Sequence, residues 1–136
     1  MLKRLTVWVL LLLAIVAALV IGTRYFLQPM STDLSVVGQG KPALVLAYEN
    51  FSPDSGALLN QLNRVRKDYE QYMNFAVADL GAPDGRTFAG RYNLGNGAVV
   101  FFSGSGEALR LLRLPGDEQG LRELLDQQLA LVGIAR

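Results

Sequence analysis

The sequence predicts an α/β domain, with a mixed β-sheet flanked by helices, preceded by a single transmembrane helix. Two observations lead to this prediction. Residues 5–22 form an apolar run whose only polar member is Thr6. After it, short continuously apolar segments alternate with amphipathic segments along the rest of the chain,. We therefore expect a cytoplasmic tip and membrane helix at 1–24, a linker at 25–32 and the sheet domain at 33–136.

The apolar run is long enough to cross a bilayer. As a helix it spans about 27 Å, close to the hydrocarbon thickness of a membrane. A cleaved secretory signal is the alternative, but the run is longer than usual for such a signal and ends without a small-x-small cleavage pattern,. An uncleaved anchor, contacting membrane lipid through residues 5–22, is therefore the prediction.

Flanking charge gives the direction of the anchor. Lys3 and Arg4 precede the span, and Arg24 alone follows it closely. Because positive charge is retained on the cytoplasmic side, the N-terminus is expected inside the cell. The prediction is a single-pass protein of the bacterial cytoplasmic (inner) membrane, with its C-terminal domain on the periplasmic side.

The first half of the domain shows two strand patterns around one helix pattern. Residues 43–48 and 74–80 are apolar, as expected of strands covered on both faces,. Between them a helix is predicted from about residue 54 to 72, with Asp54 or Ser55 as its cap. Its apolar stripe, at spacings of three and four, consists of Leu58, Leu62, Val65, Tyr69 and Tyr72,.

The second half continues the alternation and ends in a hairpin and a helix. The patterns predict a short helix, a strand, a glycine-containing hairpin loop, a second strand and a closing helix, at residues 86–92, 98–102, 103–106, 107–114 and 117–132. An additional edge strand is expected at 34–37. This order indicates two parallel crossovers followed by an antiparallel hairpin.

The composition excludes several kinds of chemistry. The chain contains no cysteine and no histidine, so thiol chemistry and imidazole catalysis are absent, and the usual zinc and haem ligands are missing. Residues 25–136 carry ten Lys or Arg and twelve Asp or Glu, a net charge of −2. Nucleic-acid binding is not expected of such a surface. We expect no cofactor and no metal.

The element order and several segments resemble the thioredoxin fold over about residues 33–132. Residues 40–46, Gly-Lys-Pro-Ala-Leu-Val-Leu, are similar to the strand leading to the redox loop of that family. Phe51-Ser52-Pro53-Asp54-Ser55 lies where the family has an aromatic residue followed by Cys-x-x-Cys. Residues 96–107 resemble the segment that holds the cis-proline, a hydrophobic strand and a hairpin. The resemblance implies a thioredoxin-like fold.

The same resemblance implies that the family's chemistry has been lost. Ser52 and Ser55 occupy both cysteine positions, and a hydroxyl cannot take part in thiol–disulfide exchange,. Gly97 stands at the cis-proline position, Leu46 at that of a buried acid and Phe51 at that of a tryptophan. Four scattered changes favour natural degeneration, although the two serines alone would also fit an engineered Cys-to-Ser pair.

Four side chains are candidate partner contacts, each with a simpler structural explanation. Arg110 and Arg113 alternate with leucines on the last strand, and either protect a sheet edge or form a docking surface,. Tyr48 and Phe51 flank the former redox loop, and either pack in the core or contact a partner. Neither Ser52 nor Ser55 lies in a hydrolase motif, so no catalytic residue is expected,.

Together these features predict a non-enzymatic, redox-inactive accessory, assembly or scaffold subunit of a membrane protein complex. Other subunits of that complex are the expected partners. One alternative is a membrane-tethered, chaperone-like module that binds extended peptides in the former substrate groove. Another is a Cys-to-Ser form of a membrane-tethered thiol–disulfide oxidoreductase.

Overall fold

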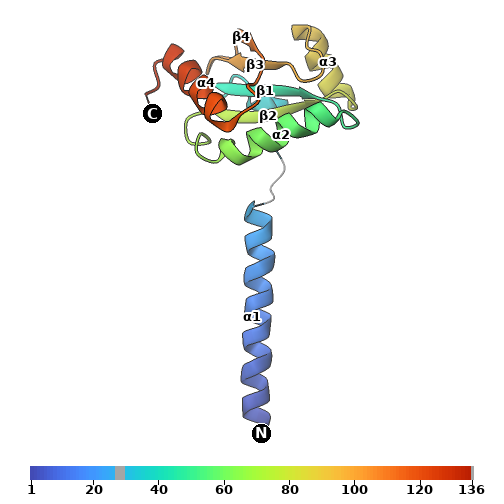
Figure 1. The fold of residues 1–136 in the computed structure, drawn as a ribbon, viewed down its shortest axis with the longest axis vertical. Helices are drawn as coiled ribbons and strands as arrows, with labels where there is room; N and C mark the ends of the chain where they lie inside the picture. Colours follow the sequence, from blue (N-terminus) through green and yellow to red (C-terminus); the bar gives the residue numbers. More distant parts are fainter. Residues whose placement is uncertain (27–29, 136) are drawn as a thin grey trace.

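The computed structural model describes residues 1–26 and 30–135, and Figure 1 shows a long N-terminal helix followed by a sheet domain. In chain order the elements are α1 (Leu2–Phe26), η1 (Leu34–Val36), β1 (Ala43–Tyr48), α2 (Pro53–Arg66), β2 (Asn74–Asp79), α3 (Pro83–Tyr92), β3 (Val99–Phe102), β4 (Ala108–Leu112) and α4 (Glu118–Leu131).

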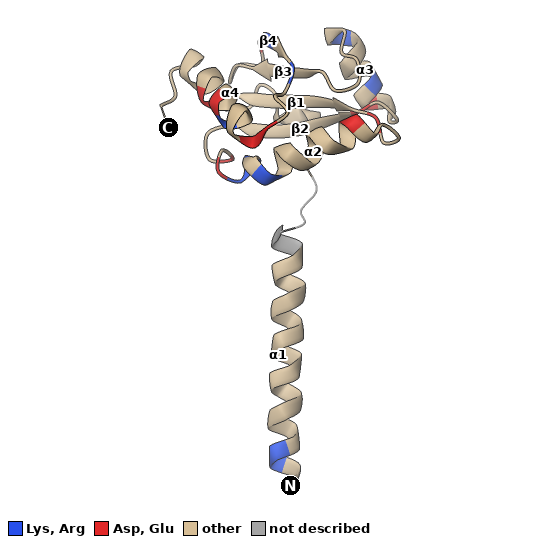
Figure 2. Ribbon diagram, in the orientation of Figure 1, with Lys and Arg blue, Asp and Glu red and all other residues tan. Residues whose placement is uncertain are grey.

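Helix α1 is apolar on all sides, and Leu2–Thr23 within it is long and apolar enough to cross a membrane. None of this stretch is buried against the rest of the protein. Figure 2 shows Lys and Arg in blue near the N-terminal end of the helix, and the sequence has Arg24 near its other end. The hydroxyl of Thr6 donates to the carbonyls of Leu2 and Lys3, at 2.9 and 3.0 Å. The one polar side chain of residues 5–22 is thereby hydrogen-bonded within the helix.

The sheet is mixed and has the strand order β2-β1-β3-β4. Strands β1 and β2 are parallel, with α2 as their crossover, whereas β1–β3 and β3–β4 are antiparallel. The prediction of two parallel crossovers is therefore wrong for the second one. After α3 the chain returns at the carboxyl end of β1, where the Gly97 N–H donates to the Ala47 carbonyl at 2.9 Å. Strand β3 starts from that end and must run back along β1.

Alternation along β1 gives each face of the sheet its own core. Leu44 and Leu46 face α2 and α4, in a cluster built from large leucine and aromatic side chains. Val45 and the alanines at 43 and 47 face α3, which brings Phe88 and Ala89 onto the sheet. Small residues on this second face allow α3 to lie close to the backbone of the sheet. A Cβ on Gly85 of α3 would lie only 1.9 Å from the backbone oxygen of Asp79.

The edge strand expected at 34–37 is a 3-10 helix instead. Asp33 caps η1 by accepting hydrogen bonds from the Ser35 backbone N–H at 3.0 Å and its hydroxyl at 2.6 Å. This local capping competes with strand formation. Pairing with β2 occurs earlier, at an isolated parallel bridge between Ser31 and Ala76. Of the linker expected at 25–32, residues 27–29 lie outside the described residues, and Met30 is already buried in the domain.

Two helix boundaries also differ from the prediction. Helix α2 ends at Arg66, and residues 67–72 form turns, although Tyr69 continues the apolar stripe and is fully buried. The stripe therefore reflects contact with the core beyond the helix itself. Helix α3 starts at Pro83, three residues before the predicted start, because proline suits the first turn of a helix,.

Candidate functional site

The loop of residues 49–52, which the resemblance compares with a redox loop, connects β1 to α2 at the carboxyl end of β1. Ser52 is the N-cap residue of α2, but its side chain makes no capping hydrogen bond. Pro53 occupies the first helical position and Asp54 the first turn, where a negative charge complements the helix dipole,. Ser55 is inside the helix and fully buried. The predicted caps, Asp54 and Ser55, are thus helical residues that follow the actual cap.

Asn96, which the sequence analysis missed, organises this loop. Its side-chain oxygen accepts hydrogen bonds from the Glu49 backbone N–H, at 3.1 Å, and from the Ser55 hydroxyl. One carboxamide thereby joins the end of β1, the start of α2 and the segment before β3. Both partners are more than 40 residues away along the chain. The only local signal was the Asn-Gly pair that Asn96 forms with Gly97.

Gly97 has a left-handed backbone conformation, with φ of 82°. Its N–H is used in the bond to the Ala47 carbonyl, so it closes the segment against β1. Glycine is the residue that adopts this conformation without strain. A Cβ here would contact a methyl group of Leu58 at 3.5 Å, which is an ordinary packing distance. The backbone conformation, rather than lack of space, therefore favours glycine.

A small cavity of about 230 Å³ lies beside this network. Its walls bring together four of the predicted site residues with neighbours from α2, the segment before β3 and the end of β4: Asp54, Ser55, Leu58, Asn96, Gly97, Arg113 and Leu114. The two charged side chains, Asp54 and Arg113, are exposed and form no ion pair with each other. The cavity thus combines two leucines with a carboxylate and a guanidinium.

The remaining predicted contacts lie outside that cavity. Tyr48 is half-buried and packs against the core between the sheet and the α2–α4 layer. Phe51 is 96% exposed on the loop itself. Arg110 is exposed on the edge strand β4, opposite Phe101 of β3. The structure therefore separates the four candidate contacts into a core residue, a loop tip, an edge residue and a cavity-lining arginine.

Hydrogen bonds perturb two ionisable groups outside this site. Those from Ser35 lower the pKa of Asp33, and those to Asp68 and Glu118 raise the pKa of Arg122. Within the described residues, no group of three or more Asp or Glu side chains is placed to hold a metal ion. What the site presents is a fixed loop with an exposed aromatic ring.

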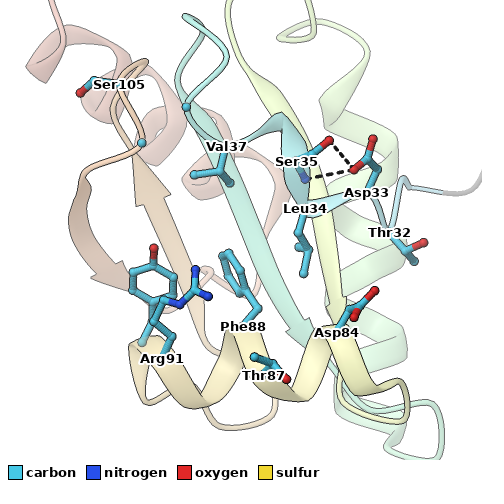
Figure 3. Close-up of a pocket in the computed structure, with 13 residues that line it drawn as sticks. Thr32, Asp33, Leu34, Ser35, Val37, Asp84, Thr87, Phe88, Arg91 and Ser105 are labelled. Carbon is cyan, nitrogen blue, oxygen red and sulfur yellow. Dashed lines mark hydrogen bonds between the residues drawn. The ribbon is translucent and has the colours of Figure 1, made fainter.

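A larger groove, of about 710 Å³, lies on the α3 face of the sheet and was not predicted from the sequence. Figure 3 shows it between η1, α3 and the β3–β4 hairpin, with Leu34, Val37 and Phe88 among its apolar residues. Phe88, Tyr92 and Phe102 form an aromatic cluster beside it, with ring centroids 4.9 to 5.7 Å apart. Asp33 and Arg91 line the groove as well.

The sequence matches no protein-family model, and no curated relative matches it. Solved structures do resemble the domain. An uncharacterised thioredoxin-like protein from Clostridium perfringens is 17% identical, with a TM-score of 0.63 over 77% of this chain and 86% of the other. Trxlp from Edwardsiella tarda EIB202 is 12% identical, with a TM-score of 0.57 over 67% of this chain and 87% of the other.

A third neighbour comes from work on the thiol resolving mechanism of yeast mitochondrial 1-Cys peroxiredoxin via glutathione/thioredoxin systems. It is 12% identical, with a TM-score of 0.59 over 74% of this chain and 96% of the other. At these identities the likeness concerns the fold. The domain has a thioredoxin-like fold, which confirms the mixed sheet flanked by helices that was expected from the sequence. It contains no cysteine, which is compatible with redox inactivity.

Proposed function

We propose that this protein is a membrane-anchored, redox-inactive thioredoxin-like protein that serves as a non-catalytic accessory, assembly or scaffold subunit of a membrane protein complex. One observation carries the proposal. The position that corresponds to the second cysteine of the redox loop is Ser55, which is fully buried and bonded to Asn96. A buried hydroxyl held by a carboxamide supports a structural use of the loop.

The anchor supports a role next to the bilayer. Helix α1 has the length and composition of a membrane span, and three residues separate its last residue, Phe26, from Met30 in the domain core. Four extended residue steps reach at most about 14 Å. The domain is thus restricted to membrane-proximal partners, and this restriction raises their effective concentration. We place the N-terminus in the cytoplasm and the domain on the periplasmic side of the inner membrane.

Gentle extraction of the full chain from its native membrane tests the proposed role. We expect it to migrate in detergent as part of an assembly much larger than its own 14.8 kDa. A matched sample treated with a harsh detergent controls for the contribution of the micelle. A lone monomer under gentle conditions contradicts the proposal.

The absence of cysteine allows a clean test of orientation. Asn60→Cys lies on the exposed surface of α2, and Leu2→Cys lies at the start of α1. We expect a membrane-impermeant maleimide to label the first variant in intact spheroplasts and the second only after the membrane is permeabilised. The reverse pattern contradicts the proposed orientation. Loss of the N-terminal residues from the mature protein contradicts the anchor.

The exposed ring of Phe51, three residues before Asp54 in the wall of the small cavity, also favours a second candidate, the peptide-binding module. Binding of an extended peptide by the full chain, lost in Phe51→Ala, would support it over the scaffold role.

The oxidoreductase alternative is tested by the double variant Ser52→Cys/Ser55→Cys. Insulin reduction by that variant would revive it, and we expect none.

A further inference from the structure

Phe51 is the most exposed large hydrophobic residue among the described residues of the domain. It is 96% exposed, compared with 65% for Leu111 and 55% for Leu131. A single exposed apolar residue is common on a protein surface. Phe51 differs because the backbone that carries it is fixed on both sides.

Hydrogen bonds fix the loop at each end. The Ser52 N–H donates to the Glu49 carbonyl at 3.1 Å, so residues 49–52 form a turn with Phe51 in its third position. The Glu49 N–H and the Ser55 hydroxyl both donate to the side-chain oxygen of Asn96. Pro53 restricts the backbone directly after the turn,.

A fixed loop lowers the cost of using an exposed aromatic ring in binding. Ordering a mobile loop on association costs free energy, and a loop already held in place avoids most of that cost. Aromatic residues are also enriched among the few interface residues that dominate affinity. The arrangement is therefore that of a preorganised anchor for an interface.

Charge around Phe51 indicates which surface it meets. Glu49 and Asp54 flank the ring in sequence, are exposed and form no ion pair within the described part of the chain. Two carboxylates are repelled by an anionic membrane surface. They suit a protein surface with Lys or Arg around an apolar pocket.

The topology also places this loop away from the point where the anchor joins the domain. The chain from α1 meets β2 at the bridge between Ser31 and Ala76. The loop leaves the sheet after Tyr48, which pairs with Asp79, three residues further along β2. Three strand residues correspond to about 10 Å. This offset suits contact with a neighbouring protein beside the anchor.

We infer that Phe51 is the docking anchor of the proposed subunit, inserted into an apolar pocket with a basic rim on a partner protein, and that Asn96 is the positioning residue that presents it. The inference rests on the proposed function and specifies the partner contact. The partner's basic rim meets the exposed carboxylates of Glu49 and Asp54. Asp54 and Arg113 both line the small cavity of about 230 Å³.

The full chain in its native membrane provides the test. Phe51→Ala is expected to reduce the fraction recovered in the assembly by about tenfold or more, the size of effect typical of a dominant interface residue. Leu131→Ala, at the exposed end of α4, is the matched control and should leave recovery unchanged. A photoreactive phenylalanine analogue at position 51 should give one discrete adduct, whose yield falls as salt is raised.

Variants of Asn96 separate positioning from folding. Asn96→Ala should reduce the adduct at position 51, and Asn96→Asp, which keeps an acceptor oxygen, should restore it. Amide hydrogen exchange at Glu49 should rise in the alanine variant and return in the aspartate variant. If Asn96→Ala destabilises the whole domain, adduct yield and Glu49 exchange are compared between Asn96→Asp and the unmodified chain. An adduct that is unchanged while Glu49 exchange rises overturns the role of Asn96.

Three further outcomes would overturn the inference. Trp8→Phe/Phe51→Trp leaves one tryptophan at the loop, and quenching of its fluorescence by brominated lipid would show membrane insertion instead of protein docking. If the assembly survives Phe51→Ala, Phe51 is not the docking residue, but the proposed function is not contradicted. A chain found only as a monomer removes both proposals.

Discussion

The two faces of the sheet are closed by different means. On the α2–α4 face, large side chains fill the core and polar side chains connect the helices: the Gln61 side chain donates to the Pro115 and Asp117 carbonyls at 2.8 and 2.9 Å, and the Tyr69 hydroxyl donates to the Arg122 carbonyl at 3.0 Å. On the α3 face, small residues bring backbone close to backbone, and a groove stays open. The first face depends on large side chains and the hydrogen bonds between them, whereas the second combines an aromatic cluster with a close backbone approach at Gly85.

The largest effect is expected from adding a methyl group to the α3 face. Gly85→Ala places a carbon 1.9 Å from the Asp79 backbone oxygen, so α3 must move away from β2. We expect a loss of about 3 kcal/mol or more in the free energy of unfolding. Urea denaturation of the full chain in micelles, followed by near-ultraviolet circular dichroism, measures it.

Gly90→Ala is the matched control on the same helix. A Cβ there has no neighbour within 4 Å. Replacing a helical glycine by alanine in open space should stabilise the domain by about 0.5–1 kcal/mol. Equal effects at positions 85 and 90 would contradict the close approach of α3.

Removing one hydroxyl from each face sharpens the comparison. Tyr69→Phe deletes a buried hydroxyl bonded to the Arg122 carbonyl and to the Asp126 carboxylate, both at 3.0 Å. We expect a loss of about 1–3 kcal/mol. Tyr92→Phe, on the α3 face, should change stability by less than about 0.5 kcal/mol. The same denaturation experiment compares the two variants. A larger loss of stability for Tyr92→Phe would contradict the conclusion that side-chain hydrogen bonds stabilise mainly the α2–α4 face.

The bond between Ser55 and Asn96 joins the first helix of one face to the segment that follows the helix of the other. Ser55→Ala should cost about 1 kcal/mol, since it removes this bond. Asn96→Ala should cost more, since it also removes the bond from the Glu49 N–H. The double variant should cost less than the sum of the two. Fully additive losses would show that the two side chains do not interact. Thermal and urea denaturation of the four proteins complete the cycle.

The smallest effect concerns the cap of η1, at the border of the groove. The Ser35 hydroxyl and N–H lower the pKa of Asp33 below its ordinary value of 3.8. Because the folded pKa is below the unfolded one, the stabilising contribution is present above about pH 3.8 and is lost as the pH falls through the folded value,. Carboxyl titration by NMR should show this, and Ser35→Ala should raise the pKa. Ser105→Ala, across the groove, should not.

Short apolar runs in the sequence correctly predicted the buried strands. Apolar runs located β1, β2 and β3, because buried strands need them on both faces. The predicted edge strand at 34–37 is absent because Asp33 caps a turn by bonding to Ser35. Helix α2 was predicted to reach Tyr72 because its apolar stripe continues to face the core after the helix ends at Arg66.

The site was predictable only in part, for a related reason. Asp54, Ser55 and Gly97 were found through the resemblance, and the structure brings them to one cavity with Arg113. Asn96 was missed because its hydrogen-bonding partners are 41 and 47 residues distant, which no periodicity reports. The groove on the α3 face was missed because it depends on how η1 and the hairpin pack together.

The conformation of Gly97 bears on evolutionary reversibility. Proline has φ near −65° and no N–H, whereas this residue has φ of 82° and donates its N–H to Ala47. If an ancestor had proline here, as the resemblance implies, reinstating it would now require rebuilding the surrounding backbone. Two point mutations would place sulfur at positions 52 and 55, but a proline at position 97 would also require a different backbone conformation in the neighbouring segment,.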